Sequence, residues 1–249
     1  MKDLLTALSF LTILPVGRGL PSEEKDLAHS MTVFPLVGLV IGLLLALGYY
    51  LLSLALPRSL TLWLTIGLLA FLTRGLHLDG LADTMDGLAS GGTREKILEV
   101  MRDSRIGAFG VISLILLIGA KYFALDHFSN HPMTYPLILM AVMGRSSMVL
   151  VCYRSPYARF EKGLARPFTE NLRFRETALS SLLALGISFW AVGLKGILVF
   201  LGIAFFSLGY RVFFMRKLGG ITGDILGAAN ELSEFLSLFL LVIFDAIPV

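Results

Sequence analysis

Long apolar segments separated by short polar ones dominate the pattern of this 249-residue chain. A helix needs about 20 apolar residues to cross about 30 Å of hydrocarbon. Seven segments reach roughly that length, and we predict a membrane-spanning helix for each: 32–56, 59–76, 107–124, 134–152, 177–194, 196–214 and 225–247. Because they use most of the chain, the pattern predicts an all-α, polytopic integral membrane protein in which residues 1–249 form a single membrane-embedded domain.

The N-terminal segment has a basic start and a short apolar run, as a signal peptide does. It lacks a clear small-residue cleavage site. Thr6, Ser9 and Thr12 recur every three residues and place a thin polar stripe on a helix. We therefore expect an interfacial or re-entrant helix before the first span.

Composition supports a membrane protein, since 56% of the residues are hydrophobic and only 16% are charged. The net charge is +3, and basic residues of membrane proteins usually mark loop topology. We expect contact with the lipid bilayer and no nucleic-acid partner. The single cysteine, Cys152, excludes an internal disulfide and a cysteine-rich metal site.

The basic residues also predict the orientation of the chain. With a cytoplasmic N-terminus, only Arg58, Lys121 and Lys195 lie outside, Arg145 lies within a span, and the remaining Lys and Arg residues are cytoplasmic. The loops rich in polar chemistry then all face the cytoplasm. This favours a membrane-embedded enzyme with cytosolic substrates over a transporter, which more often carries polar groups at mid-membrane.

Three acids stand close together in the segment "LHLDGLADTMDGLASGG". Asp79, Asp83 and Asp86 are spaced i, i+4, i+7, which puts the carboxylates on one face of a helix, where like charges repel. A solvated acidic face is the alternative, but the neighbours are apolar and no basic partner follows at i+4. Hard oxygen ligands in such a cluster suit Mg²⁺ or Mn²⁺. Gly80 and Gly87 would let a backbone or a bulky ligand approach.

A second acidic segment is "LGGITGDILGAANELSEF". Asp224 and Glu231 are seven residues apart and share a helix face with Gly227 and Ala228, two small residues that also permit close helix packing. An acid near the start of a span is costly unless it is paired or metal-bound. We expect Asp224 and Glu231 to face the same polar cavity as the first cluster, and Glu234 to lie off that face.

The segment "EVMRDSRIGAFGV" predicts an anion site. The next span begins at about Ile106, with Ser104 or Asp103 as its N-cap, and Arg102 and Arg105 lie beside this helix start. A helix N-terminus with arginines and glycines nearby suits a phosphate or diphosphate, although ordinary cytoplasmic anchoring explains the same residues.

Further basic residues need partners. Arg145 lies within a span, where an arginine requires a carboxylate or a phosphate, and we expect it to reach toward the site. The basic and aromatic loop "YRSPYARFEKGLARPF" fits a bulky anionic substrate or anionic lipid headgroups, and of the two we favour lipid contact.

Four motifs, in order from about Phe10 to Glu234, carry a resemblance: "FPLVGLVIG", "HLDGLADTMDG", "MRDSRIGAFG" and "GGITGDILGAANE". In these the chain closely resembles the adenosylcobinamide-GDP ribazoletransferase family, also called cobalamin 5′-phosphate synthases. The resemblance implies a polytopic, Mg²⁺-dependent enzyme of the cell inner membrane, and the basic loops predict that its site faces the cytoplasm. Its substrates would be adenosylcobinamide-GDP and α-ribazole or α-ribazole 5′-phosphate, and its products adenosylcobalamin or its 5′-phosphate and GMP.

With this chemistry the candidate residues receive roles. A general base must take the proton of the attacking hydroxyl, and an acid of the two clusters is the first choice and His77 the second. The expected metal ligands are Asp79, Asp83, Asp86 and Asp224; the expected substrate-binding residues are Arg102, Asp103, Ser104, Arg105 and Arg145; the candidate bases are Asp86, Glu231 and His77.

Two other functions stay open at this point. The aspartate motif also resembles the "DG…AR…G…D…D" motif of CDP-alcohol phosphotransferases of phospholipid synthesis, but no "AR" follows Gly80. A cation transporter using intramembrane acids is the alternative from a different class. The glycine-rich segment 38–48 would permit helix packing between subunits of a homo-oligomer.

Overall fold

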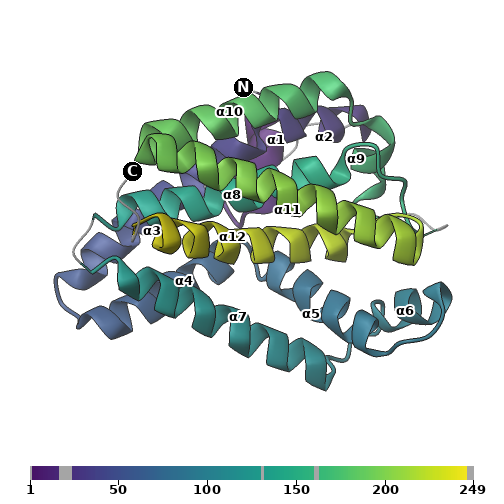
Figure 1. Cartoon of the computed structure of the whole chain (residues 1–249), viewed down its shortest axis with the longest axis horizontal. Coiled ribbons are helices and arrows are strands. Elements are labelled where there is room, and N and C mark those ends of the chain that lie inside the picture. Colours follow the sequence, from purple (N-terminus) through teal and green to yellow (C-terminus); the bar gives the residue numbers. More distant parts are fainter. Residues whose placement is uncertain (1, 17–23, 130–131, 160–162, 246–249) are drawn as a thin grey trace.

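The structure is a computed structural model that describes residues 2–16, 24–129, 132–159 and 163–245, and these form a bundle of helices (Figure 1). The helices are α1 (Lys2–Leu11), α2 (Glu24–Ser30), the 3-10 turn η1 (Met31–Val33), α3 (Phe34–Ser53), α4 (Arg58–Leu72), α5 (Leu76–Ala89), α6 (Arg94–Val100), α7 (Ala108–His127), α8 (Thr134–Cys152), α9 (Arg166–Asn171), α10 (Phe174–Val192), α11 (Leu194–Leu218) and α12 (Gly223–Asp245). Within these described ranges the only β-type pairing is an isolated bridge between Tyr157 and Ile221. The prediction of an all-α polytopic protein is confirmed.

Each predicted span corresponds to a helix, but the number of seven spans is not confirmed. Among the described residues, five segments are long and apolar enough to cross a membrane: Glu24–Ser53, Ala108–His127, Thr134–Cys152, Leu194–Leu218 and Gly223–Asp245. The predicted span 59–76 is not one continuous helix, because the chain bends by 89° between α4 and α5. These two helices make a sixth span only if the bent pair is counted as one. Helix α10 lies where 177–194 was predicted and is not among the five.

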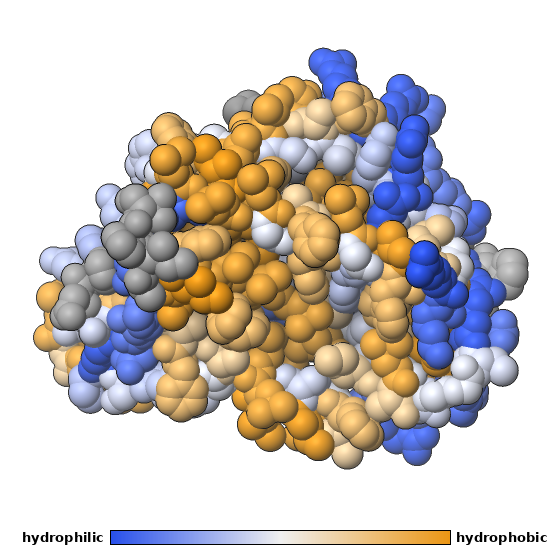
Figure 2. All heavy atoms as spheres, viewed as in Figure 1, coloured by the Kyte–Doolittle hydropathy of each residue, from blue (hydrophilic) through white to orange (hydrophobic). Residues whose placement is uncertain are grey.

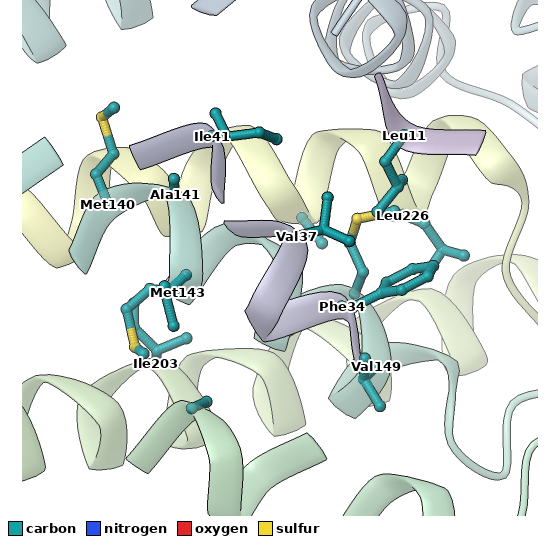
Figure 3. Packing of buried hydrophobic residues seen from close by; sticks show 14 of the residues in the cluster. Leu11, Phe34, Val37, Ile41, Met140, Ala141, Met143, Val149, Ile203 and Leu226 are labelled. Carbon is teal, nitrogen blue, oxygen red and sulfur yellow. The ribbon is translucent and has the colours of Figure 1, made fainter. Parts of the chain in front are cut away.

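The core is built around α8, which is buried over most of its length. Gly38 and Gly42 of α3 lie against its backbone, where an added Cβ would come within 2.6 Å of the Ala141 carbonyl oxygen and 2.5 Å of the Ile138 Cα. Figure 3 shows side chains of α3 and α8 packed in this core. These two glycines of the segment 38–48 therefore serve packing inside the chain, and a homo-oligomer stays a prediction.

The outer surface matches a membrane protein. Large apolar side chains of α7 are exposed, among them Phe109, Ile115, Leu116 and Phe123. Figure 2 shows hydrophobic residues over the middle of one face and hydrophilic residues toward the ends, most densely at the end where α6 lies in Figure 1. A contiguous apolar surface of this kind is expected where lipid replaces water.

The bend between α4 and α5 depends on two residues with left-handed backbone conformations. Arg74 has φ 55° and Gly75 has φ 66°. The Arg74 guanidinium donates to the carbonyl oxygens of Ser9 (3.2 Å) and Thr12 (2.6 Å), so it ties the bend to the end of α1. Thr6 and Thr12 are buried, so the polar stripe of α1 faces largely inward. The interfacial or re-entrant position of this helix stays a prediction.

Candidate active site

Helices α5 and α12 cross at very close range. A Cβ added at Gly80 would lie 2.8 Å from the Asp224 carbonyl oxygen, and one at Gly227 would lie 3.2 Å from the Cα of His77. Only residues without a Cβ allow two helix backbones to approach in this way. The approach expected at Gly80 and Gly227 is thus present, and it places the start of α12 beside the acidic face of α5. Asp83 is within electrostatic range of both Asp79 and Asp224.

A pinned loop brings an arginine to the same place. The N–H of Ala158 donates to the Ile221 carbonyl (2.9 Å), and the N–H of Ile221 donates to the Pro156 carbonyl (3.0 Å). This pairing carries Arg159, whose Nη2 lies 2.9 Å from Asp224 Oδ2. Arg159 escaped the sequence analysis because its basic, aromatic loop was interpreted as a lipid contact. The density of Arg and Tyr in "YRSPYARF" was the only signal that could have identified it.

Asp79, Arg159 and Asp224 line one cavity of about 480 Å³, and the predicted ligand Asp83 is not among its lining residues. Its polar lining residues are His77, Asp79, Arg102, Tyr157, Arg159 and Asp224. Apolar residues, including Phe10, Phe34 and Phe168, form much of the remaining wall. Four of the predicted site residues, His77, Asp79, Arg102 and Asp224, thus meet at one cavity that carries both signs of charge.

Asp86 has a different environment from Asp79. Its carboxylate accepts hydrogen bonds from the backbone N–H of Gly107 (2.7 Å) and of Gly110 (2.8 Å), so it caps the start of α7. The predicted N-cap, Ser104 or Asp103, is therefore wrong, because an acid from another helix satisfies these donors. The same contact fills the predicted anion site at this helix start, since the protein's own carboxylate occupies the place expected for phosphate.

Asp103 and Arg105 form an ion pair with each other. The Asp103 carboxylate accepts from the Arg105 backbone N–H (3.0 Å) and from its guanidinium Nη2 (2.7 Å). These hydrogen bonds lower the pKa of Asp103 to about 2. The Arg105 side chain is 87% exposed, and none of Asp103, Ser104 and Arg105 lines the 480 Å³ cavity. Of the four residues in this segment expected at the substrate, only Arg102 is brought there.

Glu231 and Arg145 belong to a buried ionic cluster, which we define as Lys121, Arg145, Glu231 and Glu234. Lys121 Nζ lies 2.7 Å from Glu231 Oε2 and also bonds Glu234, while Arg145 donates to the other oxygen of Glu234. The expectation that Glu231 faces the same cavity as the aspartates is therefore not met. Arg145 has a carboxylate partner, as its place within a span led us to expect, and this partner is Glu234. Neither Arg145 nor Glu234 lines the 480 Å³ cavity.

His77 lies between the cavity and this cluster. It is 1% exposed, it lines the cavity, and it is within electrostatic range of Arg145 and Glu234. Its Nε2 is buried and has no hydrogen-bond partner among the described residues. A buried polar atom without a partner is rare and marks a position where a ligand or water is expected to bond.

The donor chemistry of the cavity suits a hard cation, although the described part of the chain places no three His, Cys, Asp or Glu side chains around one ion. Mg²⁺ does not need such a cage, because it usually takes one or two carboxylates, substrate phosphate oxygens and water. Asp79, Asp83 and Asp224 could supply those carboxylates. Ligation by these residues and by Asp86 stays a prediction.

A helical membrane bundle that gathers carboxylates and guanidinium groups at one polar cavity is typical of a membrane-embedded enzyme for phosphorylated substrates. Comparison with known proteins identifies the family: residues 3–242 match the family model described as cobalamin-5-phosphate synthase, and the chain belongs to this family. It is an enzyme, a membrane-bound transferase of cobalamin biosynthesis.

Its relatives match over nearly the full length of both chains. Proteins named adenosylcobinamide-GDP ribazoletransferase are 40% identical in Alkaliphilus metalliredigens, over 94% of this chain and 92% of the relative, and 42% identical in Geotalea daltonii, over 95% of each. A protein of the same name from Syntrophobacter fumaroxidans is 42% identical over 94% of this chain and 95% of its own. No solved structure matches.

Proposed function

We propose that this enzyme joins adenosylcobinamide-GDP to α-ribazole or α-ribazole 5′-phosphate and releases GMP, in a reaction that depends on Mg²⁺. A hydroxyl of the ribazole attacks the phosphorus bonded to cobinamide, and the bond from that phosphorus to the GMP oxygen breaks. The attacking hydroxyl loses its proton to a base, and the electron pair of the broken bond leaves on GMP. The products are adenosylcobalamin, or its 5′-phosphate, and GMP.

The observation that carries this proposal is the pairing of opposite charges in one cavity. Asp79 and Asp224 line it together with Arg102 and Arg159. Phosphoryl transfer asks a protein mainly to position the reactants and to neutralise charge on the bridging and leaving oxygens. A diphosphate can interact with both the arginines and the aspartates, because its oxygens bind guanidinium groups directly and bind carboxylates through a bridging cation.

Asp79, Asp83 and Asp224 are the residues that would hold Mg²⁺. When bound there, the ion would neutralise negative charge on the diphosphate oxygens. Arg159 holds the Asp224 carboxylate at 2.9 Å and thereby fixes its orientation. Asp86 acts through structure, since it anchors the start of α7 against α5.

The remaining residues of the cavity bind phosphate, exclude water and take the proton. Arg102 and Arg159 would hold the phosphate of the departing GMP, where a guanidinium fork matches phosphate geometry. The apolar wall keeps bulk water from competing with the ribazole hydroxyl. His77 is our candidate base, because this residue lines the cavity and its buried Nε2 has no partner among the described residues, whereas Glu231 is engaged by Lys121.

The test is product formation by purified protein in detergent, with adenosylcobinamide-GDP, α-ribazole 5′-phosphate and Mg²⁺, and with an EDTA control. We expect Mg²⁺-dependent formation of corrinoid product and GMP in equal amounts. Asp83→Asn should abolish turnover while the protein purifies normally. If this variant keeps more than about a tenth of the wild-type rate, roughly 1.4 kcal/mol of barrier, Asp83 is not a metal ligand.

We also propose that the protein resides in the cell inner membrane with this cavity toward the cytoplasm. The support is the concentration of basic residues in the loops at that end. Because the single native cysteine, Cys152, is buried, new cysteines at exposed positions report the side. Ser104→Cys should react with an impermeant maleimide only in inside-out vesicles, and Ala55→Cys only in right-side-out cells. The reverse pattern would invert the topology.

A further inference from the structure

A second cavity, of about 730 Å³, adjoins the first one. It lies between α1, α5 and the start of α7, at the bend that follows α4. Four residues line both cavities: Phe10, Leu76, Asp79 and Leu164. Asp79 is the only acid among these four, so its carboxylate stands at the junction of the two spaces.

The linings of the two cavities differ in chemistry. The first cavity is lined by Arg102, Arg159 and Asp224, which are side chains suited to a ligand that carries phosphate. The second is largely apolar, and its lining away from the junction includes Ala82, Ile106 and Leu114. Among the described residues its one basic lining residue is Arg74, which donates to the backbone carbonyls of Ser9 and Thr12.

A group transfer between two organic substrates requires such an arrangement. The attacking and leaving oxygens lie roughly in line on opposite sides of the phosphorus, so acceptor and leaving group must reach it from different directions. Two cavities that meet at one carboxylate provide these two directions. The arginine-lined cavity matches the nucleotide half of the donor, and the apolar cavity matches an acceptor whose base is a fused, uncharged aromatic ring.

We propose that the second cavity is the acceptor subsite, which binds the apolar aromatic base of the ribazole and presents its ribose hydroxyl toward Asp79. This assignment rests on the proposed function, because it names the place of one of its two substrates. Ile106 and Leu114 form the wall on which the ring would lie, and the aromatic ring of Phe10 lies at the junction. An apolar pocket with a few polar groups at one end is the usual form of a small-molecule site.

The test fills the second cavity and measures each substrate separately. Ile106 is 53% exposed; Ile112, six residues further along the chain, is 51% exposed but lines neither cavity. Ile106→Trp should raise KM for α-ribazole at least about tenfold and leave KM for adenosylcobinamide-GDP unchanged. Ile112→Trp, the matched control, should change neither constant. Leu114→Trp is a second filling variant and should act as Ile106→Trp does.

Direct binding provides a readout that needs no turnover. Equilibrium dialysis of α-ribazole with wild-type protein should show binding without donor, and Ile106→Trp should weaken it by the same factor. A rise in donor KM alone, or unchanged acceptor binding, would overturn the assignment. If the second cavity binds phospholipid instead, the activity of the Trp variants should depend on added lipid while KM for α-ribazole stays unchanged. That result would also overturn the assignment of the acceptor subsite. An inactive wild type that still binds α-ribazole at this cavity would reject the proposed transfer and keep the subsite.

Discussion

Removing one member of the buried ionic cluster should strongly destabilise the protein. Lys121 and Glu231 are 2% and 4% exposed and stand 2.7 Å apart, in helices α7 and α12 that both qualify as membrane spans. Lys121→Met leaves two acids facing one arginine, and Glu231→Gln leaves two cations facing one acid. Losing one partner of a buried pair typically costs about 3–5 kcal/mol, because the remaining charge is buried without compensation.

The double variant Lys121→Met with Glu231→Gln distinguishes charge balance from simple loss of contacts. It leaves Glu234 and Arg145, a neutral pair in which Asn230 also donates to Glu234 (3.0 Å). We expect the double variant to cost less than the sum of the single variants, by about 0.5–3 kcal/mol of coupling. Unfolding free energies are measured by titrating SDS into the protein in mixed micelles.

An exposed ion pair on α6 provides the matched control. Lys96 and Glu99 stand 3.1 Å apart but are 56% and 72% exposed, so Lys96→Met should cost no more than about 1 kcal/mol. The reasoning is refuted if Lys121→Met costs as little as this control, or if the losses of Lys121→Met and Glu231→Gln simply add.

Three further predictions concern the cavity end. Gly80→Val should lower both activity and the thermal midpoint, since its Cβ meets the α12 backbone at 2.8 Å, whereas Gly67→Val, with nothing within 4 Å, should change neither. Arg159→Ala should lower kcat/KM about tenfold or more, because the loss of a charged hydrogen bond costs about 1.5–3 kcal/mol. The control Arg105→Ala should keep kcat/KM within about threefold of the wild type. Equal effects of the two variants would contradict the assignment of Arg159 to the substrate cavity. Asp86→Ala should cost about 0.5–2 kcal/mol of unfolding free energy through the lost cap, and a variant with unchanged stability and no activity would instead restore the metal-ligand role.

The positions of the long helices along the chain were predictable, because they depend on coarse quantities. The length of each apolar segment sets a helix, and the predicted 134–152 coincides with α8. The break between α4 and α5 was not predictable in the same way. It depends on Arg74 adopting a left-handed conformation that glycine would favour, and the carbonyls of Ser9 and Thr12, which accept from its guanidinium, are remote in sequence.

Helix periodicity identified the acidic residues but predicted that more of them line one cavity than the structure shows. Residues seven apart share a face, yet each residue rises about 1.5 Å, so the side chains stand about 10 Å apart along the axis. Asp79 and Asp224 therefore line the cavity, while Asp86 and Glu231 lie two turns away and meet different partners. Those partners, the start of α7 and Lys121, come from remote parts of the sequence, which a pattern within one segment does not contain.

The two groups of acids differ in how their charge is offset, and this bears on function. The buried ionic cluster is neutral as it stands, because Lys121 and Arg145 balance its two glutamates. Asp79 and Asp224 line the cavity together with Arg102 and Arg159, and Asp83 lies within electrostatic range of both aspartates, so among the described residues three acids accompany two arginines there. A transporter would need its uncompensated acids deep in the membrane, where an ion must pass. Here the deep acids are balanced by Lys121 and Arg145, and the aspartates that line the cavity stand beside arginines, which is the distribution that a metal-assisted transfer between phosphorylated substrates requires.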